Sequence, residues 1–217
     1  MAATLDWIYE RLLHHFGDQQ WWPADTPFEV MVGAILTQNT AWTNVEKAIN
    51  NLKANQALSA DLIADAPHEQ LAAWIRPSGY FNIKAKRLQN FCRWYLQNGR
   101  AESLRKLPMA RLRHELLSVN GIGPETADDM LLYAFHRPVF VIDSYTRRLL
   151  SRLGLIRGDE GYETLRALVE AHFGRNEEQV SLYNTLHALI VAHAKDYCRK
   201  RPQCKGCPLR RRCPVAE

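Results

Sequence analysis

Apolar residues recur at helical intervals along almost the whole chain, and this spacing is the strongest constraint on its fold. Side chains three and four residues apart share one face of an α-helix. The stripes that follow this rule include Leu5, Ile8, Leu12 and Phe16; Val45, Ile49 and Leu52; and Leu88, Phe91 and Tyr95. Leu168 and Phe173 are also expected on a helix. The only strand-like run, Pro138–Ile142 (PVFVI), is too short to form a sheet of its own. The sequence therefore predicts an all-α protein.

Prolines mark several of the expected helix starts. Proline suits the first helical position because its missing N–H would have no partner there within the helix. Starts are expected at Thr26-Pro27, Ala66-Pro67, Leu107-Pro108 and Gly123-Pro124. The 217 residues hold no internal repeat and no long linker, so they can form one large domain or two small ones.

The net charge of +5 is concentrated at the C-terminus. Residues 195–217 hold eight Lys/Arg and two Asp/Glu, whereas residues 1–194 hold twenty basic and twenty-one acidic residues. A basic end of this kind either lies in solvent or faces a polyanion such as DNA. No run of about 18 apolar residues and no basic-then-apolar leader occurs, so we expect neither a membrane span nor a secretory signal. A cytoplasmic protein, nucleoid-associated if bacterial, is expected.

The most informative stretch is Leu116–Tyr133, LLSVNGIGPETADDMLLY. Gly121 and Gly123 flank one aliphatic residue between an apolar helix end and a helix that opens at Pro124. Such a turn leaves backbone N–H groups that can bind an anion such as a phosphate. The alternative is a tight interhelical turn without a ligand. The full pattern, apolar-x-Gly-Ile-Gly-Pro-x-Thr-Ala, is far more specific than two glycines.

An acidic residue, Asp143, follows the apolar run at the expected start of another helix. By itself it would be read as an N-cap. Together with the glycine turn and at this spacing, it resembles the helix-hairpin-helix DNA glycosylases related to endonuclease III. In that superfamily the hairpin binds the DNA backbone and an aspartate at this place is catalytic. The resemblance therefore implies a catalytic role for Asp143 and DNA contacts for Gly121, Gly123 and Thr126.

The resemblance covers essentially the whole chain and implies its architecture. Two helical lobes are expected, with the active site in the cleft between them. Residues 24–137 would form a six-helix barrel that contains the hairpin. Residues 1–23 and 138–217 would form a second lobe around a metal cluster. The expected partner is double-stranded DNA with damaged bases, bound by a monomer.

Four cysteines form the pattern C-x5-C-x2-C-x5-C at the C-terminus: Cys198, Cys204, Cys207 and Cys213. Thiolates at such spacings can hold a [4Fe–4S] cluster or a tetrahedral zinc ion. The resemblance implies [4Fe–4S], although relatives usually have one more residue in the first gap. This departure leaves zinc or a distorted cluster loop as the alternative. Cys92 lies in a helical stripe and is expected in the core.

The residue at position 125 points to the reaction type. Bifunctional relatives carry a lysine two residues after the second hairpin glycine, and this lysine forms a Schiff base with the sugar. The chain has Glu125 there. We therefore expect simple N-glycosidic hydrolysis without a lyase step, with Glu125 as the second candidate for pocket or water contacts. The rivals are a bifunctional glycosylase/lyase for oxidised pyrimidines and a non-catalytic DNA-binding cluster protein.

The N-terminal third resembles the 3-methyladenine DNA glycosylases of the endonuclease III type. The resemblance rests on Trp21-Trp22-Pro23, on Phe28-Glu29 and on residues 33–40, GAILTQNT. It implies that Trp21, Trp22 and Trp42 line the base pocket, whereas core packing is the plain alternative. Indole faces attract the cationic ring of an alkylated purine by up to about 2 kcal/mol when desolvated.

Base excision from a duplex requires that the nucleotide be flipped out of the stack. Gln38 matches the family residue that fills the vacated gap, and Tyr80 stands where a wedge side chain enters the duplex. Either residue could instead serve packing or the surface. After flipping, the carboxylate of Asp143 would stabilise the oxocarbenium-like sugar and orient the attacking water.

Overall fold

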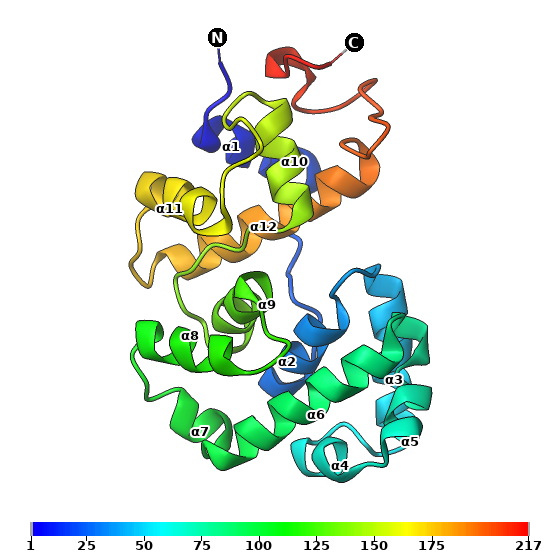
Figure 1. Cartoon of the computed structure of the whole chain (residues 1–217). Helices are drawn as coiled ribbons and strands as arrows, with labels where there is room; N and C mark the ends of the chain where they lie inside the picture. The colour runs from blue at the N-terminus through cyan, green and yellow to red at the C-terminus, as the bar shows by residue number, and fades with distance from the viewer. Residues whose placement is uncertain (1, 217) are drawn as a thin grey trace. The chain divides into compact units, whose positions relative to one another are not determined.

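The computed structural model describes residues 2–216 and contains helices and connecting segments but no strand within that range (Figure 1). The prediction of an all-α protein is therefore confirmed. The elements in chain order are α1 (Leu5–Phe16), α2 (Pro27–Leu36), α3 (Trp42–Ala54), α4 (Ala60–Asp65), α5 (His68–Trp74), η1 (Arg76–Ser78), α6 (Phe81–Gln97), α7 (Arg100–Leu104), α8 (Met109–Ser118), α9 (Pro124–Asp129), the π-helical turn η2 (Met130–Ala134), α10 (Ser144–Arg152), α11 (Tyr162–Phe173), α12 (Gln179–Asp196) and η3 (Arg210–Arg212).

The chain divides into two compact units. Trp22–His136 forms one, called here the hairpin unit, and Met1–Trp21 with Arg137–Glu217 forms the other, called the terminal unit. The hairpin unit contains α2 to α9, of which α4, α5, α7 and α9 have only five to seven residues. The six-helix barrel and the cluster lobe remain predictions.

Helix α2 lies at the centre of the hairpin unit. It is apolar on every side, and all of its residues from Glu29 to Leu36 are buried, as expected for a core helix. It contacts α3, α6, α9 and η2. Its start follows the predicted rule, because Pro27 occupies the first turn and the Thr26 hydroxyl accepts the Glu29 N–H at 3.1 Å.

Helix α6 is the long element of the hairpin unit, and α4, α5 and α2 pack against it. Its buried face carries the predicted stripe of Leu88, Phe91 and Tyr95 together with Cys92. Cys92 is fully buried, as expected for a core thiol, and burial raises its pKa.

In the terminal unit, α1 and α10 pack against α12. The run Pro138–Ile142 is buried there, but it forms no strand. The Phe140 N–H is instead bound by the carboxylate of Glu170 at 3.1 Å, so it needs no neighbouring strand. Within residues 2–216, no helix has the length and apolar character needed to cross a membrane.

Candidate functional site

The two hairpin glycines have different roles in the turn between α8 and α9. Gly121 has φ +102°, which is left-handed, and a Cβ on it would lie 2.3 Å from Cγ of Arg87. Gly123 has φ −97°, and a Cβ there would meet no atom within 4 Å. A glycine is therefore needed at position 121, because of its backbone conformation and its contact with Arg87. Gly123 instead leaves open space in front of the start of α9.

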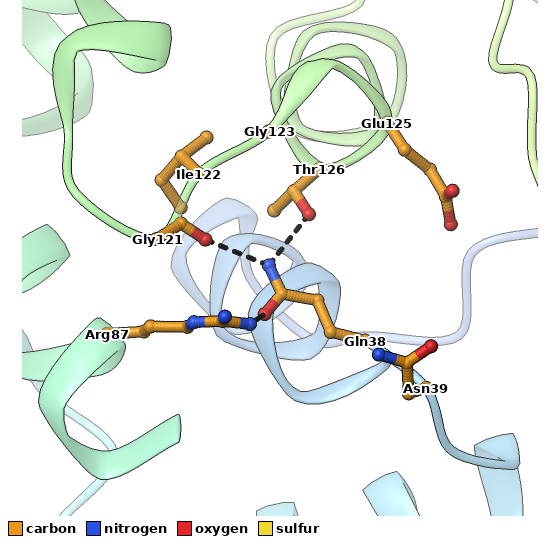
Figure 2. A pocket seen from close by; sticks show the side chains of 8 residues that line it. All are labelled: Gln38, Asn39, Arg87, Gly121, Ile122, Gly123, Glu125 and Thr126. Carbon is orange, nitrogen blue, oxygen red and sulfur yellow. Dashed lines mark hydrogen bonds between the residues drawn. The ribbon is translucent and has the colours of Figure 1, made fainter. Parts of the chain in front are cut away.

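The hairpin turn borders a pocket shown in Figure 2. Its lining residues are Gln38, Asn39, Arg87, Gly121, Ile122, Gly123, Glu125 and Thr126. The predicted DNA contacts Gln38, Gly121, Gly123 and Thr126 thus lie at one place. Arg87 and Asn39 lie there as well, although nothing in the sequence pattern singled them out.

The side chain of Gln38 joins its own turn to the hairpin. Its amide nitrogen donates to the Gly121 carbonyl at 3.0 Å and to Oγ1 of Thr126 at 2.9 Å, and its oxygen accepts from Arg87 (Figure 2). The side chain of Glu125 extends away from this network (Figure 2). A gap-filling role for Gln38 in DNA remains a prediction.

Tyr80 lies in the turn directly before α6. It has φ +47°, and its side chain is 66% exposed. A non-glycine residue in the left-handed region costs on the order of 1 kcal/mol, and an exposed ring contributes little packing to offset that cost. An exposed ring held in this conformation is compatible with a role outside the fold. The wedge role of Tyr80 remains a prediction.

Lys84, one helical turn after Tyr80, is almost completely buried. Its ammonium group donates to the carbonyls of Leu36 and Ser78, each at 2.7 Å. Burial and, to a smaller extent, the nearby charge of Arg87 lower its pKa to about 8. Sequence reasoning missed this residue because a lysine in a helix is normally at the surface.

The predicted pocket tryptophans fall into two groups. The ring centroids of Trp22 and Trp42 are 5.1 Å apart at right angles, and Tyr133 of η2 lies 5.1 Å from Trp22. The Trp22 indole also packs against the α2 backbone, since a Cβ on Gly33 would lie 3.3 Å from it. Trp21 belongs to the terminal unit, where the ammonium of Lys195 lies 5.6 Å above its ring. Tyr133 had no sequence signal.

Asp143 caps helix α10 in the terminal unit. Its Oδ1 accepts the Thr146 N–H at 2.7 Å, and its Oδ2 lies 3.5 Å from Nε2 of His187. The side chain is 13% exposed. Burial alone would raise the pKa of this carboxyl, but the His187 imidazole and the Thr146 N–H favour the charged form and lower the pKa below its ordinary value. Asp143 is thus held as an oriented carboxylate.

The four cysteines of the C-terminal segment line one cavity in the terminal unit, together with apolar side chains that include Leu149, Leu153 and Leu209. All four are free thiols. Among residues 2–216, however, no three His, Cys, Asp or Glu side chains are arranged closely enough to hold a metal ion as they stand. The thiols therefore share a cavity without a closed ligand set.

Nitrogen groups approach two of these sulfurs. Arg152 donates to Sγ of Cys198 at 3.2 Å, and Nε2 of His193 lies 3.2 Å from Sγ of Cys207. Arg148 donates to the Cys198 carbonyl at 2.7 Å, so two arginines of α10 hold the start of the segment. Hydrogen-bond donors around sulfur are what cluster thiolates need. In number and kind, the four thiols fit a [4Fe–4S] cluster or a zinc ion.

A glycine-cornered hairpin between helices, followed by an aspartate that caps the next helix, is typical of the class of helix-hairpin-helix DNA repair proteins. The family model described as "HhH-GPD superfamily base excision DNA repair protein" matches residues 32–174, and the chain belongs to this family. The resemblance inferred from the sequence is thereby confirmed.

Individual relatives agree with this family. A Methanocaldococcus jannaschii protein named "Putative DNA repair glycosylase MJ1434" is 46% identical over 95% of this chain and 94% of its own length. The crystal structure of H. pylori 3-methyladenine DNA glycosylase bound to 1,N6-ethenoadenine is 30% identical with a TM-score of 0.73, covering 88% of this chain and 95% of that one. An endonuclease III–DNA complex shares the fold with a TM-score of 0.82 at 23% identity, covering 99% and 97%.

Proposed function

We propose that this protein is a monofunctional DNA glycosylase that releases alkylated purines such as 3-methyladenine. The observation that carries the proposal is Asp143, a mostly buried carboxylate whose surroundings keep it charged. The H. pylori relative, named as a 3-methyladenine DNA glycosylase, supports the choice of substrate class.

DNA would bind at the hairpin pocket. Backbone N–H groups of the Gly121–Gly123 turn would contact a phosphate, and the open space at Gly123 allows a close approach. Thr126 would support the same contact. Tyr80 would enter the duplex as a wedge, and Gln38 would occupy the gap left by the flipped nucleotide.

The damaged base would be recognised by aromatic rings. Trp22 and Trp42 are only partly buried, and Tyr133 extends their cluster. Electron-rich ring faces select a base that carries positive charge over a neutral one. The assignment of Trp21 to the same pocket is proposed with them on the family pattern alone.

The chemistry needs little acid catalysis, because departure of an N-alkylated purine neutralises its positive charge. The sugar becomes oxocarbenium-like as the bond breaks, and the Asp143 carboxylate would stabilise that charge and orient the attacking water. Glu125 stands where a Schiff-base lysine would be needed, and Lys84 is buried on two carbonyls. No sugar–amine intermediate is therefore expected.

A [4Fe–4S] cluster would be held by Cys198, Cys204, Cys207 and Cys213. When bound, the cluster crosslinks the C-terminal segment and can exchange an electron. Absorbance near 400 nm in the purified protein supports iron–sulfur, whereas a colourless protein that contains one zinc ion refutes it.

The function is tested by incubating the protein with methylated duplex DNA and identifying the bases released. Release of 3-methyladenine by the wild type, and none by Asp143→Asn, supports the proposal. Strand scission at the product without added alkali would favour the bifunctional alternative. Tight DNA binding with no base released from methylated or oxidised DNA would favour a non-catalytic protein.

A further inference from the structure

We propose that Lys84 is a positioning residue that clamps the turn carrying Gln38 to the turn carrying Tyr80, and so fixes the spacing of the two side chains that enter DNA. This inference rests on the proposed function and adds to it a residue that touches neither DNA nor base.

The two hydrogen bonds of Lys84 define the clamp. One acceptor is the carbonyl of Leu36, the last residue of α2 and two residues before Gln38. The other is the carbonyl of Ser78, the last residue of η1 and two residues before Tyr80. A single ammonium group therefore joins the chain just before each of the two turns, and both bonds are 2.7 Å long.

The burial of Lys84 indicates that the clamp has a purpose beyond packing. An ammonium group loses its hydration when it is buried, and an apolar side chain would fill the same space without that loss. Lys84 is 1% exposed, and its bonds go to backbone carbonyls at the end of a helix and of a turn. Charge-assisted bonds of this kind are directional, so they fix the carbonyls in place.

Helix α6 also reaches the third turn of the site through Arg87, three residues after Lys84. Arg87 donates to the side-chain oxygen of Gln38, and its Cγ lies 2.3 Å from the place that a Cβ on Gly121 would take. The first turns of α6 thus hold the main chain beside Gln38 and Tyr80 through Lys84, and the Gln38 side chain against the hairpin through Arg87.

The spacing matters because wedge and gap-filling residues must enter the duplex together when a nucleotide is flipped. A displacement of about 1 Å in a supporting element can cost on the order of 100-fold in function. Tyr80 has φ +47°, a conformation that relaxes unless the surrounding bonds hold it. The bond from Lys84 to Ser78 lies directly before this strained position.

The test measures binding of the holoprotein to a duplex with an abasic-site analogue and to the undamaged duplex, at one fixed salt concentration. Lys84→Met removes both donors and keeps the length of the side chain. We expect the ratio of the two affinities to fall on the order of 10-fold or more. Lys86→Met is the matched control, because Lys86 is an exposed lysine of the same helix. Loss of a phosphate contact at Lys86 would weaken binding to both duplexes alike and leave the ratio of the two affinities unchanged.

Hydrogen exchange on the DNA-free protein gives a second readout. The Thr40 N–H bonds to Thr37 and the Gly79 N–H bonds to Arg76, so each reports on one of the two turns. Both amides should exchange faster in Lys84→Met than in Lys86→Met, while amides of α12 stay unchanged. If Lys84→Met does not fold, Lys84→Gln takes its place, since its shorter, neutral side chain loses the charge of the clamp, and the same fall in the affinity ratio is expected.

The outcomes separate this inference from the proposed function. A wild type that does not prefer the abasic duplex contradicts the proposed function and the clamp together. A wild-type preference that survives unchanged in the Lys84 variant overturns the clamp alone. Unchanged exchange at Thr40 and Gly79 in that variant also overturns it.

Discussion

The hairpin unit and the terminal unit hold their functional residues in different ways. In the hairpin unit, the turns at Gln38, Tyr80 and Gly121 are joined by side chains of the protein itself, chiefly Lys84 and Arg87. In the terminal unit, the cysteine segment is attached mainly through Arg148 and Arg152, and its four thiols line a cavity without forming a closed ligand set.

This difference shows which part of the site is preorganised by the chain alone. The turns at Gln38, Tyr80 and Gly121 have short, directional bonds between protein groups, so their geometry needs no ligand. Arg148 and Arg152 bind the cysteine segment through short hydrogen bonds as well, but its four thiols are not arranged to hold a metal ion as they stand, so their final arrangement is expected to depend on the proposed cluster. The following variants test this difference between the two units.

Asp143→Asn should have the largest effect. Asparagine is an equally good N-cap for α10, so the fold should persist while the carboxylate charge is lost. Base release in single-turnover assays should fall on the order of 1,000-fold. Affinity for an abasic-site duplex should remain within about threefold, since the hairpin turns are untouched. Retained turnover in this variant would contradict the catalytic assignment.

Removal of one cysteine should damage the terminal unit and spare the hairpin unit. Cys204→Ala takes away one of the four thiols of the cavity and should lower the free energy of unfolding by about 4 kcal/mol or more. Thermal unfolding and hydrogen exchange measure the loss in each unit. Cys92→Ala is the control, because Cys92 lies in the core of the hairpin unit and should leave absorbance near 400 nm intact. Equally faster hydrogen exchange in both units of Cys204→Ala would contradict the proposed difference between them.

The two hairpin glycines give a matched pair. Gly121→Ala places a methyl group in a left-handed position against Arg87 and should cost about 1–3 kcal/mol of stability, measured by denaturant unfolding. Gly123→Ala meets open space, so stability should change by less than about 0.5 kcal/mol. DNA affinity should nevertheless fall in Gly123→Ala, because the methyl group occupies the space that a phosphate would enter. The reverse pattern would argue against a phosphate at this turn.

His187→Gln should have the smallest effect, visible in the pH profile of base release. The His187 interaction lowers the pKa of Asp143, so its loss should move the acid limb of the profile to higher pH. Because the folded pKa lies below the ordinary value of 3.8, ionised Asp143 stabilises the fold above that pH. This contribution is lost as the pH falls through the lowered pKa. An unchanged acid limb would mean that His187 does not act on Asp143.

Features with a local signal were predicted from the sequence. The start of α2 at Thr26-Pro27, the hairpin turn and the helix that begins after Asp143 each depend on neighbouring residues. Composition and periodicity were enough for the all-α class. The run Pro138–Ile142 was the only strand-like segment, and it forms no strand; the Glu170 carboxylate binds its Phe140 N–H.

Features that depend on distant parts of the chain were not predictable. Lys84 binds a carbonyl 48 residues away, Tyr133 joins Trp22 and Trp42, and His187 lies beside Asp143. In each case the residue type usually has a surface or core role. Its role at the site depends on a partner that is distant in the sequence and close only in the folded chain.

Asp143 caps the start of helix α10, and Arg148 and Arg152, towards its end, donate hydrogen bonds to Cys198. Nine residues make a rod of about 13 Å. A rod this short is stiff, so a movement of one end displaces the other. Oxidation of the four cysteines would therefore change the orientation of the Asp143 carboxylate before the protein unfolds. Base release would then fall at an early stage of cysteine oxidation.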